Sequence, residues 1–174
     1  MYEIEVPHGV TVKLDGKQLH IKGKLGSTVK KLDLRLATFK VEDNKITVGE
    51  INNKKLEKKS AHAAQAFSSQ IREALNTVNT GIEKRMTVVF AHFPMSIEVK
   101  GKEVHIKNIF GEKVPRIAKI IGDTKVAVKG QEITVTGVDK YDVGQTMTNL
   151  MHGCHARGQD TRVFQDGIYP NREE

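Results

Sequence analysis

An internal repeat restricts the fold of this 174-residue chain more than any other feature of the sequence. The eleven residues 16–26 recur as residues 101–111, which is 85 positions later, and six of the eleven are identical. A long period that occurs only twice indicates a duplicated domain, because solenoids stack three or more shorter units to bury a core. The sequence therefore predicts two similar domains, residues 1–81 and residues 82–174, with the break near Gly81.

Each half contains alternating apolar and polar residues on both sides of short turn signals. Asp15-Gly16 separates two alternating runs, and an Asp-Gly pair in this setting is a strong hairpin signal. A second hairpin is predicted across Asp43-Asn44 in the first half and across Lys129-Gly130 in the second. Such alternation is typical of antiparallel strands that bury one face.

Each half is also predicted to contain one amphipathic helix. In the first half, apolar residues after Ser60 step by three or four along one stripe, and Gly81 follows as a stop signal. In the second half, Asp142 can cap the helix. The two stripes are Ala63, Phe67, Ile71, Leu75 and Val78, and Val143, Met147, Leu150 and Met151. The expected fold class is α+β: two tandem duplicated domains, each a small antiparallel β-sheet packed on one face by one α-helix.

The charge of the chain favours a polyanionic partner. The net charge is +7 and the pI is about 9.4, so the electric field of the protein attracts nucleic acid first and an anionic membrane surface second. The first residues lack the basic and apolar parts of a signal peptide, and no apolar run reaches membrane-spanning length. We therefore expect a soluble, intracellular protein without a membrane partner.

The sequence gives no sign of an enzyme or of a cofactor. Phosphate-binding loops, dinucleotide-binding turns, nucleophile elbows and zinc-protease helices are absent. Cys154 is the single cysteine, and together with His152 and His155 it falls short of the four ligands that zinc normally takes. His20 and His105 occupy equivalent strand positions and are expected on the sheet face away from the helix. We expect no catalytic residues, metal, cofactor or small-molecule substrate.

Four short stretches of the sequence resemble a known family. They are Ala91-His92-Phe93-Pro94, Gly137-Val138-Asp139-Lys140, Val143-Gly144-Gln145 and Arg162-Val163-Phe164-Gln165-Asp166-Gly167-Ile168-Tyr169. With the duplicated layout, they are similar to the universal large-subunit ribosomal protein six family, and more to its archaeal and eukaryotic branch than to its bacterial branch.

The resemblance implies a structural component of the large subunit of the cytoplasmic ribosome. It would bind large-subunit rRNA near the sarcin-ricin loop and the stalk base, where translation factors dock, beside neighbouring large-subunit proteins. The second domain, with its C-terminal tail, would make most of the rRNA contact. A free-standing RNA-binding regulatory protein is the first alternative, and an enzyme acting on an anionic substrate is the second.

Eight residues of the second domain are candidates for rRNA binding. Basic side chains around this domain could neutralise backbone phosphates. Gly144, beside Gln145 at a helix start, permits close approach of phosphate, although tight helix-on-sheet packing would explain it equally well. Tyr169 could stack on a base, reach a phosphate or pack on the domain. The candidates are Lys113, Arg116, Lys119, Gly144, Gln145, Arg157, Arg162 and Tyr169.

Two further features are interpreted with the alternatives open. Phe164 is favoured as a packing residue over an RNA-stacking residue, within a stretch that is expected to form a terminal hairpin around Asp166-Gly167. Four lysines before the first helix could contact RNA or could only keep the surface soluble: Lys54, Lys55, Lys58 and Lys59.

Overall fold

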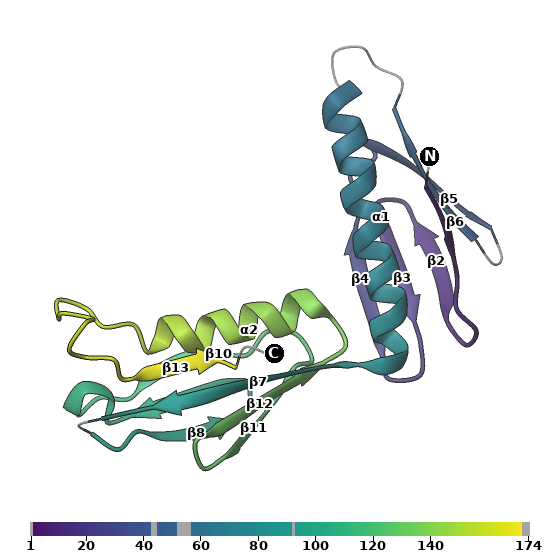
Figure 1. Ribbon diagram of the computed structural model, residues 1–174. Helices are drawn as coiled ribbons and strands as arrows, with labels where there is room; N and C mark the ends of the chain where they lie inside the picture. The colour runs from purple at the N-terminus through teal and green to yellow at the C-terminus, as the bar shows by residue number, and fades with distance from the viewer. Residues whose placement is uncertain (1, 43–44, 52–56, 92, 172–174) are drawn as a thin grey trace. The chain divides into compact units, whose positions relative to one another are not determined.

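The computed structural model describes residues 2–42, 45–51, 57–91 and 93–171. The chain divides into two compact units, Met1–Gly81 and Ile82–Glu174, which we describe separately as the first and the second domain. In the part of the chain that the structure describes, each domain contains one long helix and two antiparallel sheets (Figure 1). None of the described helices is long and apolar enough to cross a membrane.

The first domain consists of two three-stranded sheets and helix α1. One sheet has the order β1-β6-β5 and the other has the order β2-β3-β4. The elements are β1 (Tyr2–Glu5), β2 (Thr11–Asp15), β3 (Gln18–Lys22), β4 (Ser27–Lys31), β5 (Ala37–Glu42), β6 (Lys45–Glu50) and α1 (Glu57–Thr80). Leu14 lies opposite Leu19 across the Asp15-Gly16 turn, and Phe39 lies opposite Val48, so both predicted hairpins are confirmed.

The second domain repeats this topology and adds to it. Its sheets have the orders β11-β12-β7-β13 and β10-β9-β8. The elements are β7 (Ile82–Val89), β8 (Ser96–Lys100), β9 (Glu103–Lys107), the 3-10 helix η1 (Ile109–Gly111), β10 (Arg116–Lys119), β11 (Lys125–Lys129), β12 (Glu132–Gly137), α2 (Lys140–Gly153) and β13 (Gly167–Pro170). The repeated sequence is therefore a repeated fold, and η1 and β13 are additions of the second domain.

The predicted fold class is confirmed, with a richer sheet structure than the sequence indicated. The two hairpins of each domain fall in separate sheets, and each hairpin gains a third strand, β1 or β4 in the first domain and β7 or β10 in the second; β13 adds a fourth strand beside β7. Gly16 and Gly101, which correspond in the repeat, both have positive φ angles, +54° and +61°. A left-handed turn residue favours glycine, which explains why the repeat keeps this residue.

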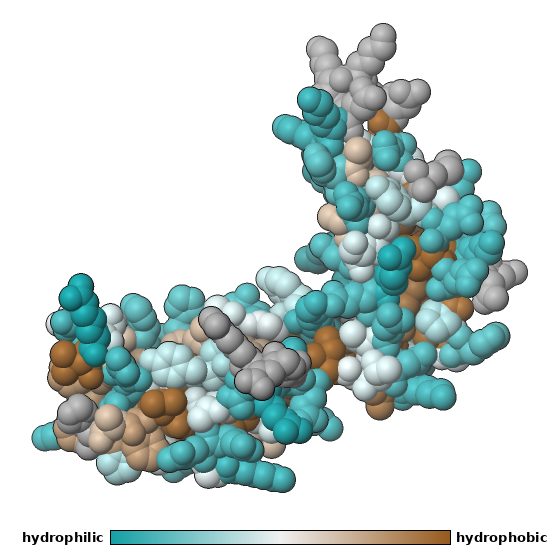
Figure 2. Space-filling model, viewed as in Figure 1, coloured by the Kyte–Doolittle hydropathy of each residue, from teal (hydrophilic) through white to brown (hydrophobic). Residues whose placement is uncertain are grey.

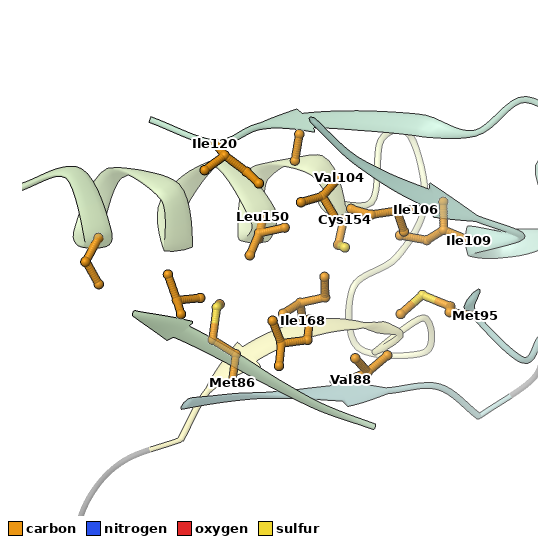
Figure 3. Packing of buried hydrophobic residues seen from close by; sticks show 14 residues of the cluster. Met86, Val88, Met95, Val104, Ile106, Ile109, Ile120, Leu150, Cys154 and Ile168 are labelled. Atoms are coloured by element: carbon orange, nitrogen blue, oxygen red, sulfur yellow. The ribbon is translucent and has the colours of Figure 1, made fainter. Parts of the chain in front are cut away.

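Aliphatic side chains form the core of each domain between the helix and the sheets. In the first domain, Ile71, Leu75 and Val78 of the predicted α1 stripe are buried. In the second domain, Figure 3 shows Leu150 of α2 directed toward Met86 of β7. Each such side chain contributes roughly 1.5–3 kcal/mol when it is fully buried. The rest of the labelled second-domain core is Val88, Met95, Val104, Ile106, Ile109, Ile120, Cys154 and Ile168.

Three details of the sequence interpretation are wrong. Asp142 does not cap α2: the cap is Asp139, whose carboxylate accepts a hydrogen bond from the Tyr141 N–H at 2.9 Å. Met151, predicted to belong to the buried stripe of α2, is 40% exposed and lies outside the core. The stretch around Asp166 does not form a terminal hairpin, because β13 pairs with β7 instead. A lone strand is stabilised when it extends an existing sheet edge, and β7 offers that edge.

Candidate nucleic-acid interface

The predicted basic residues gather mainly where α2 ends. The segments 108–115 and 154–166, called the loop end below, lie together at this end of the second domain (Figure 1). Phe110 of η1 packs edge-on against Phe164, with ring centroids 6.2 Å apart, and so joins the two segments. The packing role favoured for Phe164 is confirmed.

Arg116, the first residue of β10, connects the two segments of the loop end. Its Nε and Nη2 donate hydrogen bonds to the two carboxylate oxygens of Glu112, at 2.8 Å and 2.5 Å. Its Nη1 donates to the carbonyl oxygens of Gly153 and His155, at 3.1 Å and 2.8 Å. The last carbonyls of a helix have no partner within the helix, so the guanidinium supplies donors where α2 needs them. Its carbon Cζ lies 5.6 Å from the centre of the Phe110 ring, within cation–π range.

Arg116 is thus committed to contacts within the domain. The side chain is only 19% exposed, and the four hydrogen bonds use most of the five N–H groups of a guanidinium. The hydrogen bond from Arg116 lowers the pKa of Glu112, and the nearby charges of Arg116 and Arg157 lower it further. The same pair raises the pKa of Arg116 against the opposing effect of burial.

The remaining basic residues of the loop end are available to a partner. Lys113, Arg157 and Arg162 are exposed, and no described residue forms an ion pair with any of their side chains. The backbone N–H of Arg162 donates to the Asp160 carboxylate at 2.9 Å, which fixes the turn but leaves the guanidinium outside. The charge of Arg157 acts on Glu112 from a distance, but among the described residues Glu112 forms its direct ion pair with Arg116.

Two of the stretches that carry the family resemblance meet beside the loop end. Asp166 is 3% exposed, and its Oδ1 accepts a hydrogen bond from the Ala91 N–H at 2.8 Å. The Asn108 Nδ2 donates to the Pro94 carbonyl at 3.1 Å. Asn108 and Phe110 have left-handed φ angles of 58° and 50°, a conformation that non-glycine residues rarely adopt. Side-chain contacts therefore hold η1 in a strained shape.

The hydroxyl of Tyr169, which the sequence made a candidate for phosphate binding, is already bonded within the domain. Its hydroxyl donates to the Gln165 carbonyl at 2.9 Å, and its ring lies against Gly167, where a Cβ would be 3.3 Å from the ring. The side chain is nevertheless 47% exposed, so stacking of the ring on RNA stays a prediction. Phosphate binding by the hydroxyl would require the bond to Gln165 to break.

Lys119, Gln145 and Gly144 lie away from the loop end, along α2 and β10. The Asn149 Nδ2 donates to the Lys119 carbonyl at 2.8 Å, and the Gln145 Nε2 donates to the Asn149 Oδ1 at 3.1 Å. Gly144 is exposed, and a Cβ placed on it would meet nothing within 4 Å. Tight helix-on-sheet packing is therefore excluded as the reason for this glycine. The structure places the eight candidates in two groups and does not bring them to a single point.

The other residues singled out in the sequence lie elsewhere. Lys54 and Lys55 fall outside the described residues, and Lys58 and Lys59 are exposed in the first turn of α1. His20 and His105 lie on the sheet faces away from the helices, as predicted. Burial raises the pKa of the Cys154 thiol to about 12. In the described ranges, no three His, Cys, Asp or Glu side chains are placed to hold a metal ion.

Sequence reasoning missed Glu112 and Asp166 as residues that shape this site. Glu112 stands four positions before Arg116, and opposite charges at this spacing are a known pairing signal in helices. Here the pair forms in a loop that leads into β10, so the helical rule had no reason to apply. Asp166 gave no separate signal, because its partner is a backbone N–H 75 residues away in the sequence.

Comparison with known proteins agrees with the resemblance. The large ribosomal subunit protein uL6 of Methanocella arvoryzae is 39% identical to this chain over 168 residues, which cover 96% of this chain and 93% of that protein. The uL6 proteins of Methanobrevibacter smithii and Thermoplasma volcanium are 39% and 38% identical, over 96% and 95% of this chain and 92% of each relative. The chain belongs to the ribosomal protein L6 family.

These relatives are archaeal, as the family resemblance predicted. The model of the family, described as ribosomal protein L6, matches residues 93–167. This range contains η1, β10, α2 and the tail as far as the start of β13. The part of the chain that carries the family signature is therefore the part that builds the loop end.

Proposed function

We propose that this L6-family chain is a structural component of the large ribosomal subunit and that its second domain binds large-subunit rRNA. Its relatives carry the name large ribosomal subunit protein uL6, and they match nearly the whole chain. The observation that carries the RNA-binding part is the loop end, where Lys113, Arg157 and Arg162 are exposed without a carboxylate partner among the described residues.

The chemistry of the loop end suits an RNA backbone. Exposed guanidinium and ammonium groups supply sequence-independent affinity for phosphates, and arginine can bind a phosphate with two parallel hydrogen bonds. Apolar side chains are exposed in the same region: Val114 is 75% exposed and Val163 is 60% exposed. Figure 2 shows hydrophobic residues at the surface of this end of the second domain. A mixed basic and apolar surface favours burial against a partner over permanent hydration.

We propose a positioning role for Arg116 in place of the expected phosphate contact. It holds the start of the 154–166 segment through two backbone carbonyls and holds the β10 approach through Glu112. The effect is to fix the segment that carries Arg157 and Arg162. Binding surfaces gain affinity when their side chains are ordered before the partner arrives.

The exposed face of α2 forms a second part of the proposed interface. Gly144 leaves the helix backbone accessible, and no steric need inside the domain explains it. A glycine in a helix costs roughly 1 kcal/mol relative to alanine, so an external reason for it is expected. An RNA backbone that approaches α2 closely, with Gln145 and Lys119 beside it, supplies that reason.

The position in the subunit follows from the family resemblance. The chain would lie near the sarcin-ricin loop and the stalk base of the cytoplasmic ribosome, beside neighbouring large-subunit proteins, and would support the region where translation factors dock. This proposal predicts that the protein cosediments with large subunits in high salt. A free-standing RNA-binding regulator would instead leave intact subunits at moderate salt and appear on other RNAs.

A matched pair of triple variants tests the loop end. Lys113→Gln, Arg157→Gln and Arg162→Gln remove three exposed charges at the proposed contact, and Lys102→Gln, Lys125→Gln and Lys129→Gln remove three exposed charges elsewhere in the same domain. Binding to protein-free large-subunit rRNA of an archaeal relative is measured against salt concentration. Each lost phosphate contact lowers the slope of the log–log plot by about 0.7–0.9, so the first triple should lower it by about 2. An equal fall of the salt slope in both triple variants would contradict the placement of the rRNA contact at the loop end.

A further inference from the structure

The duplicated sheets β2-β3-β4 and β8-β9-β10 present corresponding faces with different charge pairing. Helix α1 covers one face of β2-β3-β4, and the opposite face is its outer face (Figure 1). The repeat aligns Lys13 with Glu98 and Lys22 with Lys107, at the offset of 85 residues. The strand register aligns Lys31 of β4 with Lys119 of β10, because Lys31 lies opposite Gln18 and Lys119 lies opposite Glu103, which is the repeat equivalent of Gln18.

On the second-domain face, carboxylates neutralise the lysines. Glu98 Oε1 accepts a hydrogen bond from Lys107 Nζ at 2.5 Å, and Glu98 Oε2 lies 3.6 Å from Lys100 Nζ. The hydrogen bond from Lys107 lowers the pKa of Glu98, with the charges of Lys107 and Lys100 adding to the effect. Glu103 lies opposite Lys100 in the ladder and opposite Lys119 in the next.

On the first-domain face, the lysines have no such partners. Lys13, Lys22 and Lys31 are exposed, and no described carboxylate lies within ion-pair distance of their side chains. Lys13 stands where the second domain has Glu98, so the group that would neutralise Lys22 is replaced by another positive charge. Asp15 is the one acidic residue on these three strands. The face also exposes Thr11, Gln18, His20, Ser27 and Val29.

We propose that this lysine face, defined by Lys13, Lys22 and Lys31 on β2-β3-β4, binds the phosphate backbone of large-subunit rRNA. The proposal rests on the ribosomal function proposed above and adds a second RNA contact on the first domain. The charge of the whole chain supports it. Residues 1–81 contain 14 Lys and Arg against nine Asp and Glu, and residues 82–174 contain 14 against 12, so most of the net positive charge belongs to the first domain.

The side chains on the face identify the kind of contact. Single-stranded RNA is usually held by bases that stack on large aromatic rings, and the three strands contain no Phe, Tyr or Trp. Lysines bind phosphates as point charges, and the hydroxyl and amide groups of Thr11, Ser27 and Gln18 can bond phosphate or ribose oxygens. The face therefore fits the backbone of a structured RNA segment, read without base contacts.

The neighbouring sheet of the same domain lacks this character. The outward side chains of β1-β6-β5 include Glu3, Glu5 and Glu42 as well as Lys40 and Lys45, and Lys45 Nζ lies 3.8 Å from Glu3 Oε2. Acidic residues outnumber lysines on this sheet, so an excess of positive charge is found on β2-β3-β4 and not on β1-β6-β5. A contact of the first domain with a polyanion is expected at β2-β3-β4 and not at β1-β6-β5.

Two triple variants of the full-length chain test the lysine face. Lys13→Gln, Lys22→Gln and Lys31→Gln remove the three charges of the lysine face, and Lys40→Gln, Lys45→Gln and Arg72→Gln remove three exposed charges elsewhere in the domain. The probe is protein-free large-subunit rRNA of an archaeal relative. The first triple should lower the salt slope by about 2 and the affinity at low salt at least tenfold, and the second should change both far less. Thermal unfolding followed by circular dichroism should be unchanged, since all six side chains are exposed.

A single substitution makes the test more specific. Lys13→Glu gives the first domain the carboxylate of Glu98 and should bring Lys22 into an ion pair like that of Lys107. It should weaken rRNA binding more than Lys13→Gln does. The reverse change, Glu98→Lys, frees Lys107 and Lys100 on the second domain and should strengthen binding at low salt.

The outcomes separate this inference from the proposed function. If the unaltered protein fails to bind the rRNA at all, the proposed function fails. If it binds and the lysine-face triple keeps the original salt slope, or if both triples lose affinity equally, the lysine-face inference is overturned and the proposed function stands. If rRNA binding is unchanged but incorporation into subunits falls, the face docks on an acidic protein, and the RNA assignment is likewise overturned.

Discussion

The two domains share one topology and differ most at the ends of their helices. Helix α1 has 24 residues and ends at Thr80; the N–H of the next residue, Gly81, donates to the Thr77 carbonyl, and β7 begins at Ile82. Helix α2 has 14 residues and is followed by the 154–166 segment and β13. In the β-ladders, Arg116 lies opposite Ile106, and Thr28 lies opposite the corresponding Ile21. Arg116, which holds the end of α2 to Glu112 and is called the clamp below, therefore takes the place of a buried threonine of the first domain.

This difference shows how a duplicated fold can take on separate tasks. Both domains keep the strand order, the turn glycines and the aliphatic core that the fold requires. The second domain then adds η1, the Arg116 clamp and the 154–166 segment, called the tail below, all at one end of α2. The first domain keeps a plain sheet and concentrates positive charge on its outer face. We therefore propose that the second domain supplies a contact of defined shape and that the first domain supplies diffuse electrostatic attraction.

The sharpest test of this contrast is Arg116→Ala, for which we expect the largest effect. The change removes four hydrogen bonds at a half-buried site and should destabilise the second domain by about 2–3 kcal/mol. Arg116→Lys should recover little of this, because an ammonium group lacks the planar fork. The buried Cys154 is the single thiol of the chain, so its alkylation rate measures opening of the second domain alone.

The same variant separates a positioning role from a phosphate contact. If Arg116 only fixes the tail, Arg116→Ala should weaken rRNA binding while the salt slope stays as in the unaltered protein. If Arg116 neutralises a phosphate, the slope should fall by about 0.7–0.9. Lys125→Ala is the control in the same domain, because its side chain is exposed outside the proposed interface and neither the slope nor the domain stability is expected to change. A fall in slope with Arg116→Ala would restore the direct contact predicted from the sequence.

Arg116 also marks the limit of what the sequence could predict. The repeat and the alternating pattern predicted two α+β domains, the hairpins and the helix stripes, because these depend on local spacing. The strands β1, β4, β7 and β10 were missed, since each pairs with a partner far along the chain or across a loop without a hairpin signal, and even β7, with eight residues, gave no signal of its pairing. The cap Asp139 was misplaced by three positions because Asp142 is an equally good capping residue type.

The candidate site shows the same division. Charge and residue type indicated which side chains could meet phosphate, and the exposure of Lys113, Arg157 and Arg162 agrees with that role. What separates them from Arg116 is its position on the covered face of β10 and its two carbonyl partners on another element. Contacts of this kind depend on tertiary distance, which neither spacing nor composition contains.

A smaller effect is expected at Gly144, where stability and binding should change in opposite directions. Gly144→Ala places a Cβ in open space and should stabilise α2 by about 0.5–1 kcal/mol. Gly144→Leu should keep the fold but weaken rRNA binding by about tenfold, since its side chain blocks close approach to the helix, an effect of roughly 1.4 kcal/mol. Gly153→Ala is an informative contrast, because its Cβ would lie 3.2 Å from Ile106 and should disturb the core. Full rRNA affinity in Gly144→Leu would remove α2 from the proposed interface.

The smallest expected effect is a pH dependence of stability at the loop end of the second domain. The folded state lowers the pKa of Glu112 through its bond to Arg116. A carboxyl group with a lowered folded pKa contributes stability above its unfolded pKa, near 4.3 for glutamate, and loses it as the pH falls through the folded value. Opening of the second domain is measured by the modification of Cys154 with a dipyridyl disulfide, a reagent that reacts with thiols in acid. The modification should accelerate below about pH 4 in the unaltered protein, because the second domain opens more often. The acceleration should be weaker in Glu112→Gln. Because Glu112 is partly exposed, the change is expected to be well below that of Arg116→Ala. An identical acid profile in both proteins would mean that the Arg116 clamp holds the tail through the backbone carbonyls alone.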